Sequence, residues 1–378
     1  MSVRVPIKAD TLRWAREVIG MPRDTLAKAA GVSASRISDF ETGATHPTYR
    51  QAGLMAAKLD RSLAFLFADP PQTSDVARTL DFRGRTDGEL STQLNVEIKR
   101  AEQHRDTLLN LAGDDLSSRD SLGAVTWETI RDRAREFRKI LGLEPSFTPP
   151  TSTPEESLKF WRGVFENNGY LVFQTTGIEM TEFKGLSIDH ERLPVILLNG
   201  ADFAHSRVFT LFHEVSHLAN RTSGVCLLSD NVWEEALANR FAAEALMPAD
   251  QVVRALPADG DVDMRVDLTA SKFRVSCLSA AIRLRTLDII TEDQLGDYQW
   301  RSETEWKKRR KKQKESSGFV PHWRLRYRDL GPNYVGRVAE AVENERITLL
   351  DASYLLHARI PAVEQMFREV NRLGQAGR

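Results

Sequence analysis

The spacing of hydrophobic and polar residues predicts helices over most of the chain and a short strand-forming region near its middle. Apolar positions recur at helical spacing over residues 9–19 and in segments that begin near Pro22 and Ser33. Three short runs with β-type composition lie further along, at residues 170–174, 183–188 and 195–198. The chain is therefore expected to be mainly α with a small β-sheet, an α+β fold.

Changes in composition divide this pattern into parts. A Pro-Pro pair closes the first helical module, and residues 71–150 form charged helical stretches with weak cores, as in a connector. A dense basic run later separates two helical regions. The expected parts are residues 1–70, a helical module; 71–150, a helical connector; 151–300, the domain with the strands; 301–320, a basic linker; and 321–378, a helical C-terminal region.

Residues 23–43 have the pattern of a helix-turn-helix. Ala30 is small where two helices must approach, and Gly31 lies where the chain leaves the first of them. Ser33 can cap the second helix, which buries Ile37 and Phe40 and turns its other face outward, as a recognition helix does. The candidate DNA-contacting residues are Arg23, Ser33, Ser35, Arg36 and Asp39.

Over residues 9–67 this segment resembles the XRE (Cro/repressor) class of helix-turn-helix domains, with Glu41-Thr42-Gly43 and Pro47 at the expected places. Arg23 departs from the class, because many members carry Gln there, so the operator sequence stays open. Residues 1–68 hold ten Lys and Arg against six Asp and Glu, a modest surplus for phosphate contact. The alternative is a small helical docking or dimerisation domain.

The most specific pattern in the chain is His213-Glu214-Val215-Ser216-His217. Two histidines four positions apart on a helix lie about 6 Å apart along its axis on one face, so both imidazoles can bind one zinc ion. Glu214 lies about 100° around the helix from the first histidine, where it can act on a water at the metal. Two ordinary core or surface histidines remain the alternative.

A zinc site of this kind needs a third ligand, and the helix expected at 231–247 offers three glutamates. Glu235 shares a face with small residues that would let this helix lie close to the first. Glu244 falls on the opposite face, and Glu234 is the nearest rival because boundaries read from sequence are uncertain. The expected ligands are His213, His217 and Glu235, with Zn2+ as the cofactor.

Residues 150–300 resemble the ImmA/IrrE family of zinc metallopeptidases. The resemblance is carried by LPVILLNGADFAHSRVFTLFHEVSHLAN and WEEALANRFAAEALMP. It implies a zincin-like domain, a third ligand four positions before the Asn of the second helix, which is Glu235, and the observed order of an XRE module, a peptidase and a helical tail. Phe212 departs from the family, where Ala is usual, and its bulk could narrow the site.

These residues support hydrolysis of a peptide bond, with Glu214 as the general base that activates water at the zinc and then returns the proton to the leaving amine. Residues 195–198 could be an edge strand that pairs with an extended substrate, or equally a buried central strand. No residue is assigned as an oxyanion donor, since His205 and Arg207 read as solvated or surface side chains.

Overall composition narrows the function classes. The net charge is -1, so nucleic-acid binding has to reside in a local module. Two cysteines are too few for a disulfide framework, and Cys226 is interpreted as a small buried thiol. The chain has no run of eighteen apolar residues and no secretory signal, which predicts a cytoplasmic protein without a membrane span.

Two further segments have alternatives. The basic run at 307–314 is interpreted as a solvated linker, with nucleic-acid contact as the less favoured alternative. The tail segment at 346–353, with its capping Thr348, is interpreted as a second, degenerate helix-turn-helix or a dimerisation element.

The sequence thus predicts a DNA-binding transcriptional regulator with a zinc-dependent endopeptidase domain. The resemblance implies that its substrate is another regulatory protein, such as a repressor or the product of a neighbouring gene, and a homodimer is a further expected assembly. The alternative is a transcription factor or antitoxin-like regulator whose zinc domain senses a signal or binds a partner and cleaves nothing.

Overall fold

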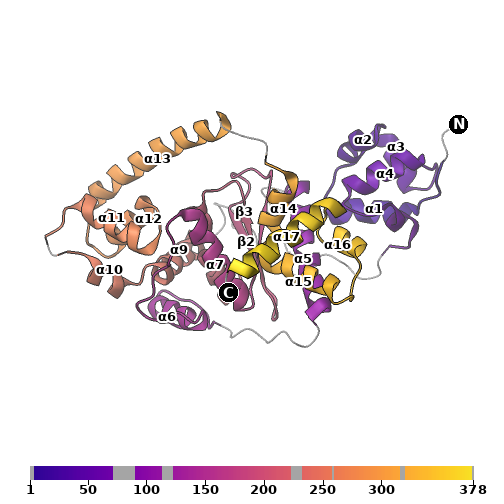
Figure 1. Cartoon of the computed structure of the whole chain (residues 1–378). Helices are drawn as coiled ribbons and strands as arrows, with labels where there is room; N and C mark the ends of the chain where they lie inside the picture. The colour runs from indigo at the N-terminus through magenta and orange to yellow at the C-terminus, as the bar shows by residue number, and fades with distance from the viewer. Residues whose placement is uncertain are drawn as a thin grey trace. The chain divides into compact units, whose positions relative to one another are not determined.

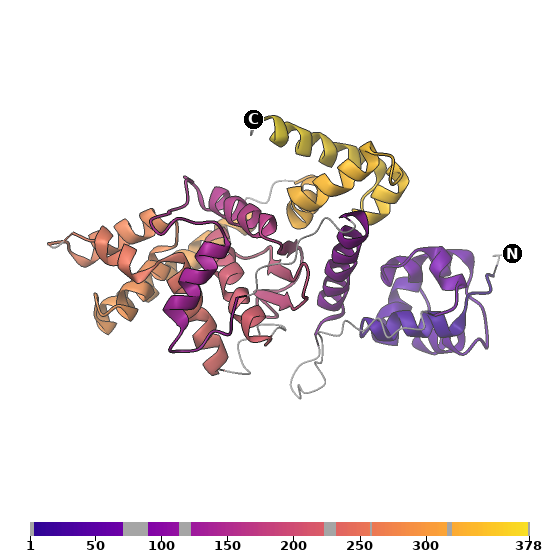
Figure 2. The same ribbon diagram turned by 90° about the horizontal axis from the view of Figure 1, so that it is seen from below.

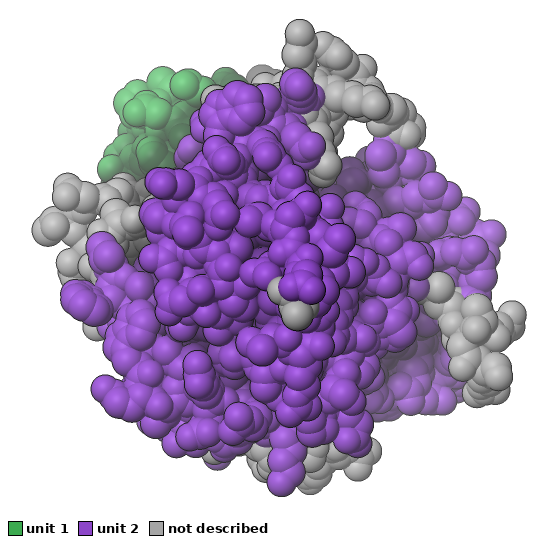
Figure 3. All heavy atoms as spheres, turned by 90° about the vertical axis from the view of Figure 1, so that its left-hand side faces the viewer, with its two compact units in different colours: residues 1–102 green, residues 103–378 purple. Residues whose placement is uncertain are grey.

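The computed structural model describes residues 4–70, 90–112, 122–222, 232–257, 259–315 and 320–376. The chain forms two compact units, residues 1–102 and residues 103–378, which are coloured separately in Figure 3. Within the described residues, no helix has both the length and the apolar composition needed to cross a membrane. Both units are mainly helical, as the sequence predicts.

The first unit is a small helical bundle (Figure 1). Its elements are α1 (Ala9–Val18), α2 (Arg23–Ala30), α3 (Ala34–Glu41), α4 (Tyr49–Lys58) and a 3-10 turn, η1 (Leu63–Phe67). Helix α5 (Thr92–Ala112) begins in this unit and ends in the second.

The turn between α2 and α3 has the geometry that the sequence predicts for a helix-turn-helix. Gly31 is left-handed, with φ of 67°, where glycine has no steric penalty. The Ser33 hydroxyl accepts a hydrogen bond from the backbone N–H of Arg36 at 3.3 Å and so caps α3. Ile37 and Phe40 are buried in the core of the unit.

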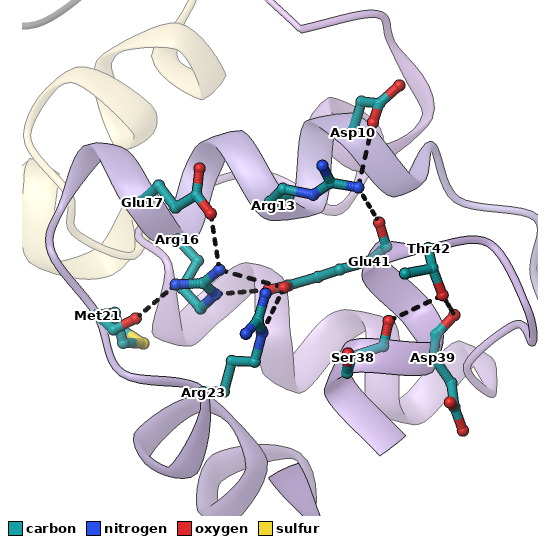
Figure 4. Close-up of polar contacts among 10 residues, drawn as sticks. All are labelled: Asp10, Arg13, Arg16, Glu17, Met21, Arg23, Ser38, Asp39, Glu41 and Thr42. Carbon is teal, nitrogen blue, oxygen red and sulfur yellow. Dashed lines mark hydrogen bonds and ion pairs between the residues drawn. The ribbon is translucent and has the colours of Figure 1, made fainter. Parts of the chain in front are cut away.

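A buried ion cluster joins the first three helices (Figure 4). The Glu41 side chain is 1% exposed, and its carboxylate accepts hydrogen bonds from Arg16 Nε at 2.5 Å and Arg23 Nε at 2.8 Å. Arg13 donates to the backbone carbonyl of Glu41 at 2.7 Å. Burial alone would raise the pKa of Glu41, but the hydrogen bonds and positive charges of Arg16 and Arg23 lower it below its ordinary value.

The second unit contains the sheet and the remaining helices. Its elements up to residue 315 are α6 (Ile130–Ile140), α7 (Pro154–Asn167), β1 (Leu171–Thr175), β2 (Gly185–Ile188), β3 (Val195–Asn199), α8 (Ala204–Asn220), α9 (Val232–Leu246), α10 (Ala249–Ala255), α11 (Val262–Phe273), α12 (Cys277–Thr286) and α13 (Glu292–Glu315).

The three strands form one sheet in the order β1-β3-β2, with β1 parallel and β2 antiparallel to β3. Of the two alternatives for residues 195–198, the edge strand is wrong and the buried central strand is confirmed, because β3 is the central strand and is buried along its whole length. In the described sheet β2 lies at an edge, and α8 packs against β2 and β3. β2 is thus the edge strand that packs against α8.

The hydrophobic core of this unit begins earlier than residue 151. Ile130 and Phe137 of α6 belong to the same core as Phe165, Phe212 and Phe241. The sequence indicated only weak cores here because α6 is strongly charged outside its narrow apolar stripe. The basic run at 307–314 also differs from its predicted setting, since these residues lie on α13.

Four helices complete the second unit and lie together in Figure 2: α14 (His322–Leu330), α15 (Pro332–Glu343), α16 (Leu349–Leu355) and α17 (Ile360–Ala376). Between α16 and α17, His357 is left-handed, and Val363 and Met366 are buried six and nine residues later. Ile37 and Phe40 follow Gly31 at the same spacing. The tail thus has the local spacing expected of a second helix-turn-helix.

Glu41→Gln is expected to destabilise the first unit by roughly 3 kcal/mol, because it leaves the arginines without their buried partner. The control Glu17→Gln removes an exposed charge paired with Arg16 and should cost less than about 1 kcal/mol. Amide hydrogen exchange in α1 and α3 under increasing urea measures both changes.

The lowered pKa of Glu41 also predicts the pH dependence of this unit. Its stabilising contribution is present above the ordinary carboxyl pKa and is lost as pH falls through the lower pKa of the folded state. Acidification should therefore destabilise the wild-type unit more than Glu41→Gln. Equal acid sensitivity of the two proteins would contradict this role.

Candidate functional site

Helix α8 carries the two histidines on one buried face. Their spacing places the Nε2 atoms of His213 and His217 3.1 Å apart, and each residue is 6% exposed. The helix ends at Asn220, its cap Arg221 is left-handed, and the next residue, Thr222, contacts His217. The structure thus brings together the two imidazoles that the sequence pairs.

Glu235 of α9 completes the group. Its carboxylate oxygens lie 3.3 Å from His213 Nε2 and 3.5 Å from His217 Nε2, and one ligand atom from each residue lies within 4.8 Å of the others. Ala238 and Ala242 are fully buried and let α9 lie close against α8. Two imidazole nitrogens and one carboxylate form a donor set that suits zinc and leaves a position for water or substrate.

The other ring nitrogens of the histidines have partners that sequence reasoning did not identify. His213 Nδ1 lies 3.0 Å from Asn239 Oδ1, and His217 Nδ1 lies 3.1 Å from Thr222 Oγ1. These contacts orient both rings so that their Nε2 atoms face Glu235. Asn239 could have been found from helix spacing, because it lies four residues after Glu235. The contact of Thr222 with His217 could not, because it depends on the turn after α8.

Charge and burial act differently on the two imidazoles. Burial and the neighbouring His213 lower the pKa of His217 to about 4, against the opposing effect of Glu235. Burial also acts to lower the pKa of His213, but its hydrogen bond to Glu235 and the charges of Glu214 and Glu235 outweigh it and raise the pKa. His217 is thus neutral near pH 7, the form that a metal ligand requires.

Glu214 points toward the edge strand β2. It is fully buried in α8, and Gly185 of β2 lies beside its carboxylate. A Cβ added to Gly185 would lie 2.8 Å from Glu214 Oε1 and 2.3 Å from Thr210 Cγ2. The strand can therefore approach the carboxylate this closely because residue 185 has no side chain.

These groups line a cavity of about 970 Å³. His213, Glu214 and Glu235 lie on its wall together with Lys184 and Gly185 at the start of β2. Phe212 is not among the lining residues and does not narrow the site; it fills the core against Trp161, 4.9 Å between ring centroids, and Phe165. The bulky residue next to the first histidine is thus part of the hydrophobic core.

The other residues considered from sequence have different positions. Glu244 is paired with the fully buried Arg283 and accepts a hydrogen bond from the Ala249 backbone N–H at 3.0 Å. Arg207 is bonded to Gln174, and neither Arg207 nor His205 is among the cavity-lining residues. Cys226 lies outside the described residues.

The candidate DNA-contacting residues lie at the start of α2 and along α3. Arg23 is 47% exposed although it is bonded to Glu41, and Ser33 caps α3. The hydroxyls of Ser33 and Ser35 lie 2.9 Å apart. Arg36 and Asp39 form an exposed pair at 3.5 Å, so nucleic acid would have to replace that weak contact.

Comparisons with known proteins agree with this division of the chain. Residues 171–285 match the family described as the IrrE N-terminal-like domain, Peptidase_M78, and residues 12–66 match a helix-turn-helix family. Both matches confirm the combination of a helix-turn-helix domain and a metallopeptidase-family domain that the sequence predicts. No curated protein matches the chain.

One solved structure that aligns with the chain is Bacillus thuringiensis PlcR in complex with the peptide PapR7 and DNA. It is 13% identical, the alignment covers 98% of this chain and 99% of that chain, and the TM-score is 0.16. A score this low does not establish a common fold.

Glu235→Ala is expected to remove most of the bound zinc, because it deletes one of three candidate ligands. Glu234→Ala should keep full zinc, and Glu244→Ala should keep zinc while losing stability through the unpaired Arg283. Metal analysis of the purified variants measures this. Full zinc in Glu235→Ala together with loss in Glu234→Ala would reverse the assignment.

Gly185→Ala is expected to displace β2 or the Glu214 carboxylate, because the new Cβ has no room beside Thr210. Zinc content should stay unchanged, since the three atoms nearest to this Cβ position belong to Thr210 and Glu214 and to none of the candidate ligands. Ser187→Ala, further along the same strand, is the control. A structure of the variant with Glu214 and β2 unmoved would contradict the role given to this glycine.

Proposed function

Because the chain joins an XRE-type helix-turn-helix domain to an IrrE-like domain of a metallopeptidase family, we propose that it is a DNA-binding regulator that hydrolyses a peptide bond in another regulatory protein. The observation that carries this proposal is the convergence of His213, His217 and Glu235 at a cavity that His213, Glu235 and the buried Glu214 line. A purely structural metal site would not require an acidic side chain at that place.

In the proposed reaction, His213, His217 and Glu235 hold zinc, with Asn239 and Thr222 fixing the two rings. Zinc, when bound, supplies a Lewis acid that polarises the scissile carbonyl. Glu214 accepts a proton from the attacking water, and the protonated carboxyl then donates that proton to the leaving amine. Glu214 suits this role by position, because it is buried in α8 and lines the same cavity as His213 and Glu235.

The proposed substrate is held as an extended segment. β2 lies at an edge of the described sheet and reaches the cavity through Lys184 and Gly185, so its outer main chain can pair with a peptide. β2, rather than residues 195–198, is therefore the strand proposed to pair with the substrate. Main-chain pairing would hold the peptide beside Glu214 irrespective of much of its sequence.

The proposed target is a repressor or a neighbouring-gene product, as the resemblance implies. A helix-turn-helix on the same chain would bring the peptidase to a promoter, where such a protein is bound. The surplus of basic residues in the first 68 residues supports contact with phosphates.

Glu214→Gln is expected to abolish peptide cleavage, by roughly a hundred- to ten-thousand-fold in rate, while zinc content and DNA binding are kept. Both proteins are expressed with the products of the neighbouring genes, which are followed for fragments, and the controlled promoter is read out. An identical promoter response without fragments in either case would establish a non-proteolytic regulator in which the zinc domain senses a signal or binds a partner.

Arg36→Ala is expected to weaken specific DNA binding by the full-length chain about tenfold or more, because a base contact contributes about 1–3 kcal/mol. Lys58→Ala removes an equal charge from the last turn of α4 and should have little effect. Gel shifts over a range of salt concentrations measure both. Absence of any salt-dependent shift in the wild type would favour a docking domain.

A further inference from the structure

The cavity at the candidate metal site continues along α9 beyond the groups that the reaction requires. On α9 it is lined from Glu235 to Glu244, over more than two helical turns. Residues at the start of α6 and on α12 line it as well. Much of this extension is apolar, formed by Trp127, Ile130, Phe209, Ala236, Ala243 and Ile282.

Two tryptophans with large exposed surfaces lie at this extension. Trp127 lines the cavity and is 48% exposed, and Trp233 is 75% exposed. Their rings meet edge to face, with centroids 6.4 Å apart and an interplanar angle of 90°. Trp233 lies one helical turn before the cavity residue Ala236, so the pair stands on the cavity face of α9.

Exposing two tryptophan side chains to water has a free-energy cost in the unliganded protein. Tryptophan has the largest apolar surface of any side chain, and holding two of them together in water exposes a patch of the kind that marks binding sites. Trp127 is also positioned by its contact with Trp233, so its ring offers a fixed apolar face. An apolar side chain entering the cavity would remove that face from water.

We propose that Trp127, supported by Trp233, forms a specificity subsite that accepts an aromatic or long aliphatic side chain of the substrate next to the scissile peptide bond. The proposal rests on the proposed peptidase function. A substrate side chain is the expected occupant of this subsite, because the apolar extension and the candidate catalytic groups His213, Glu214 and Glu235 line one cavity. A substrate held at Glu214 can therefore place a neighbouring side chain against this wall.

Charged side chains of both signs also line the cavity, namely Glu128, Glu244, Arg131 and Arg240, with Glu244 paired to Arg283. They set no preference against an acidic substrate residue, so the selectivity that follows from Trp127 is for size and apolar character. A small side chain such as alanine would leave Trp127 exposed. Selectivity is therefore expected for a large apolar side chain over alanine.

The test uses hydroxamates, which bind zinc without a substrate sequence, on the zinc-loaded full-length protein. The probes carry a benzyl, an isobutyl or a methyl group next to the hydroxamate, and their affinities are measured by calorimetry. The wild type should bind the benzyl and isobutyl compounds on the order of tenfold more tightly than the methyl compound.

Trp127→Ala should reduce the preference for benzyl over methyl to within about twofold, with zinc content and affinity for the methyl compound unchanged. Trp127→Phe should keep most of the preference, which separates loss of the aromatic face from a folding defect. Trp300→Ala is the matched control, because Trp300 is 70% exposed on α13 and is not among the cavity-lining residues. Its probe affinities should equal those of the wild type.

The outcomes distinguish the two proposals. Zinc uptake with equal affinities for the benzyl and methyl compounds would overturn the subsite alone, as would a preference that survives in Trp127→Ala. Failure of the wild type to take up zinc would overturn the proposed peptidase function and the subsite with it. Retained preference in Trp127→Phe and loss in Trp127→Ala would support the subsite.

Discussion

The close packing of α8 on α9 is the constraint on which the rest of the second unit depends. Ala238 and Ala242 have no accessible surface, and larger side chains there would push α9 outward and carry Glu235 away from the histidines. The aromatic core behind α8, which includes Phe212, fixes the other side of the helix. The candidate metal group therefore depends on side-chain volumes at positions that never touch it.

Buried carboxylates in this chain differ in what surrounds them. Glu41 and Glu244 are each paired with a buried arginine, which makes their negative charge part of the packing. Glu214 is equally buried, but it faces the cavity and the backbone of β2 at Gly185. The chain thus uses the same chemical group for structural cohesion at two places and places it in the wall of a cavity at a third.

Site residues could be predicted where they interact with neighbours in the sequence, and could not where their partners lie far away along the chain. His213 and His217 could be predicted because their relation is local to one helix, and Glu235 because a helical face and a family resemblance both indicated it. The role of Gly185 could not be predicted, since it depends on β2 approaching a helix far along the sequence. The order of the strands has the same long-range origin, and an apolar run such as β3 reads alike at an edge or in the centre.

The place of α6 in the main core could not be predicted for a related reason, because most of its residues are charged. Its buried stripe includes Ile130, Ala134 and Phe137, which is enough to join the main core although the surrounding residues are charged. Burial depends on the partner helix as much as on the helix itself, and α9 supplies that partner. A domain boundary inferred from composition alone therefore fell after α6, whereas the core extends back to Leu122.

In the proposed peptidase, the strand edge and the apolar subsite would have different tasks in substrate recognition. Pairing with a strand edge provides affinity through the main chain, whereas a side-chain subsite provides the choice between sequences. Both require the substrate to be extended at the cleavage point, and an apolar residue at that point is usually buried in a folded protein. If the target is a folded repressor, the scissile segment becomes available only when its own fold opens there. Exposure of that segment, rather than a change at His213, Glu214 or His217, is then the step at which a signal can act.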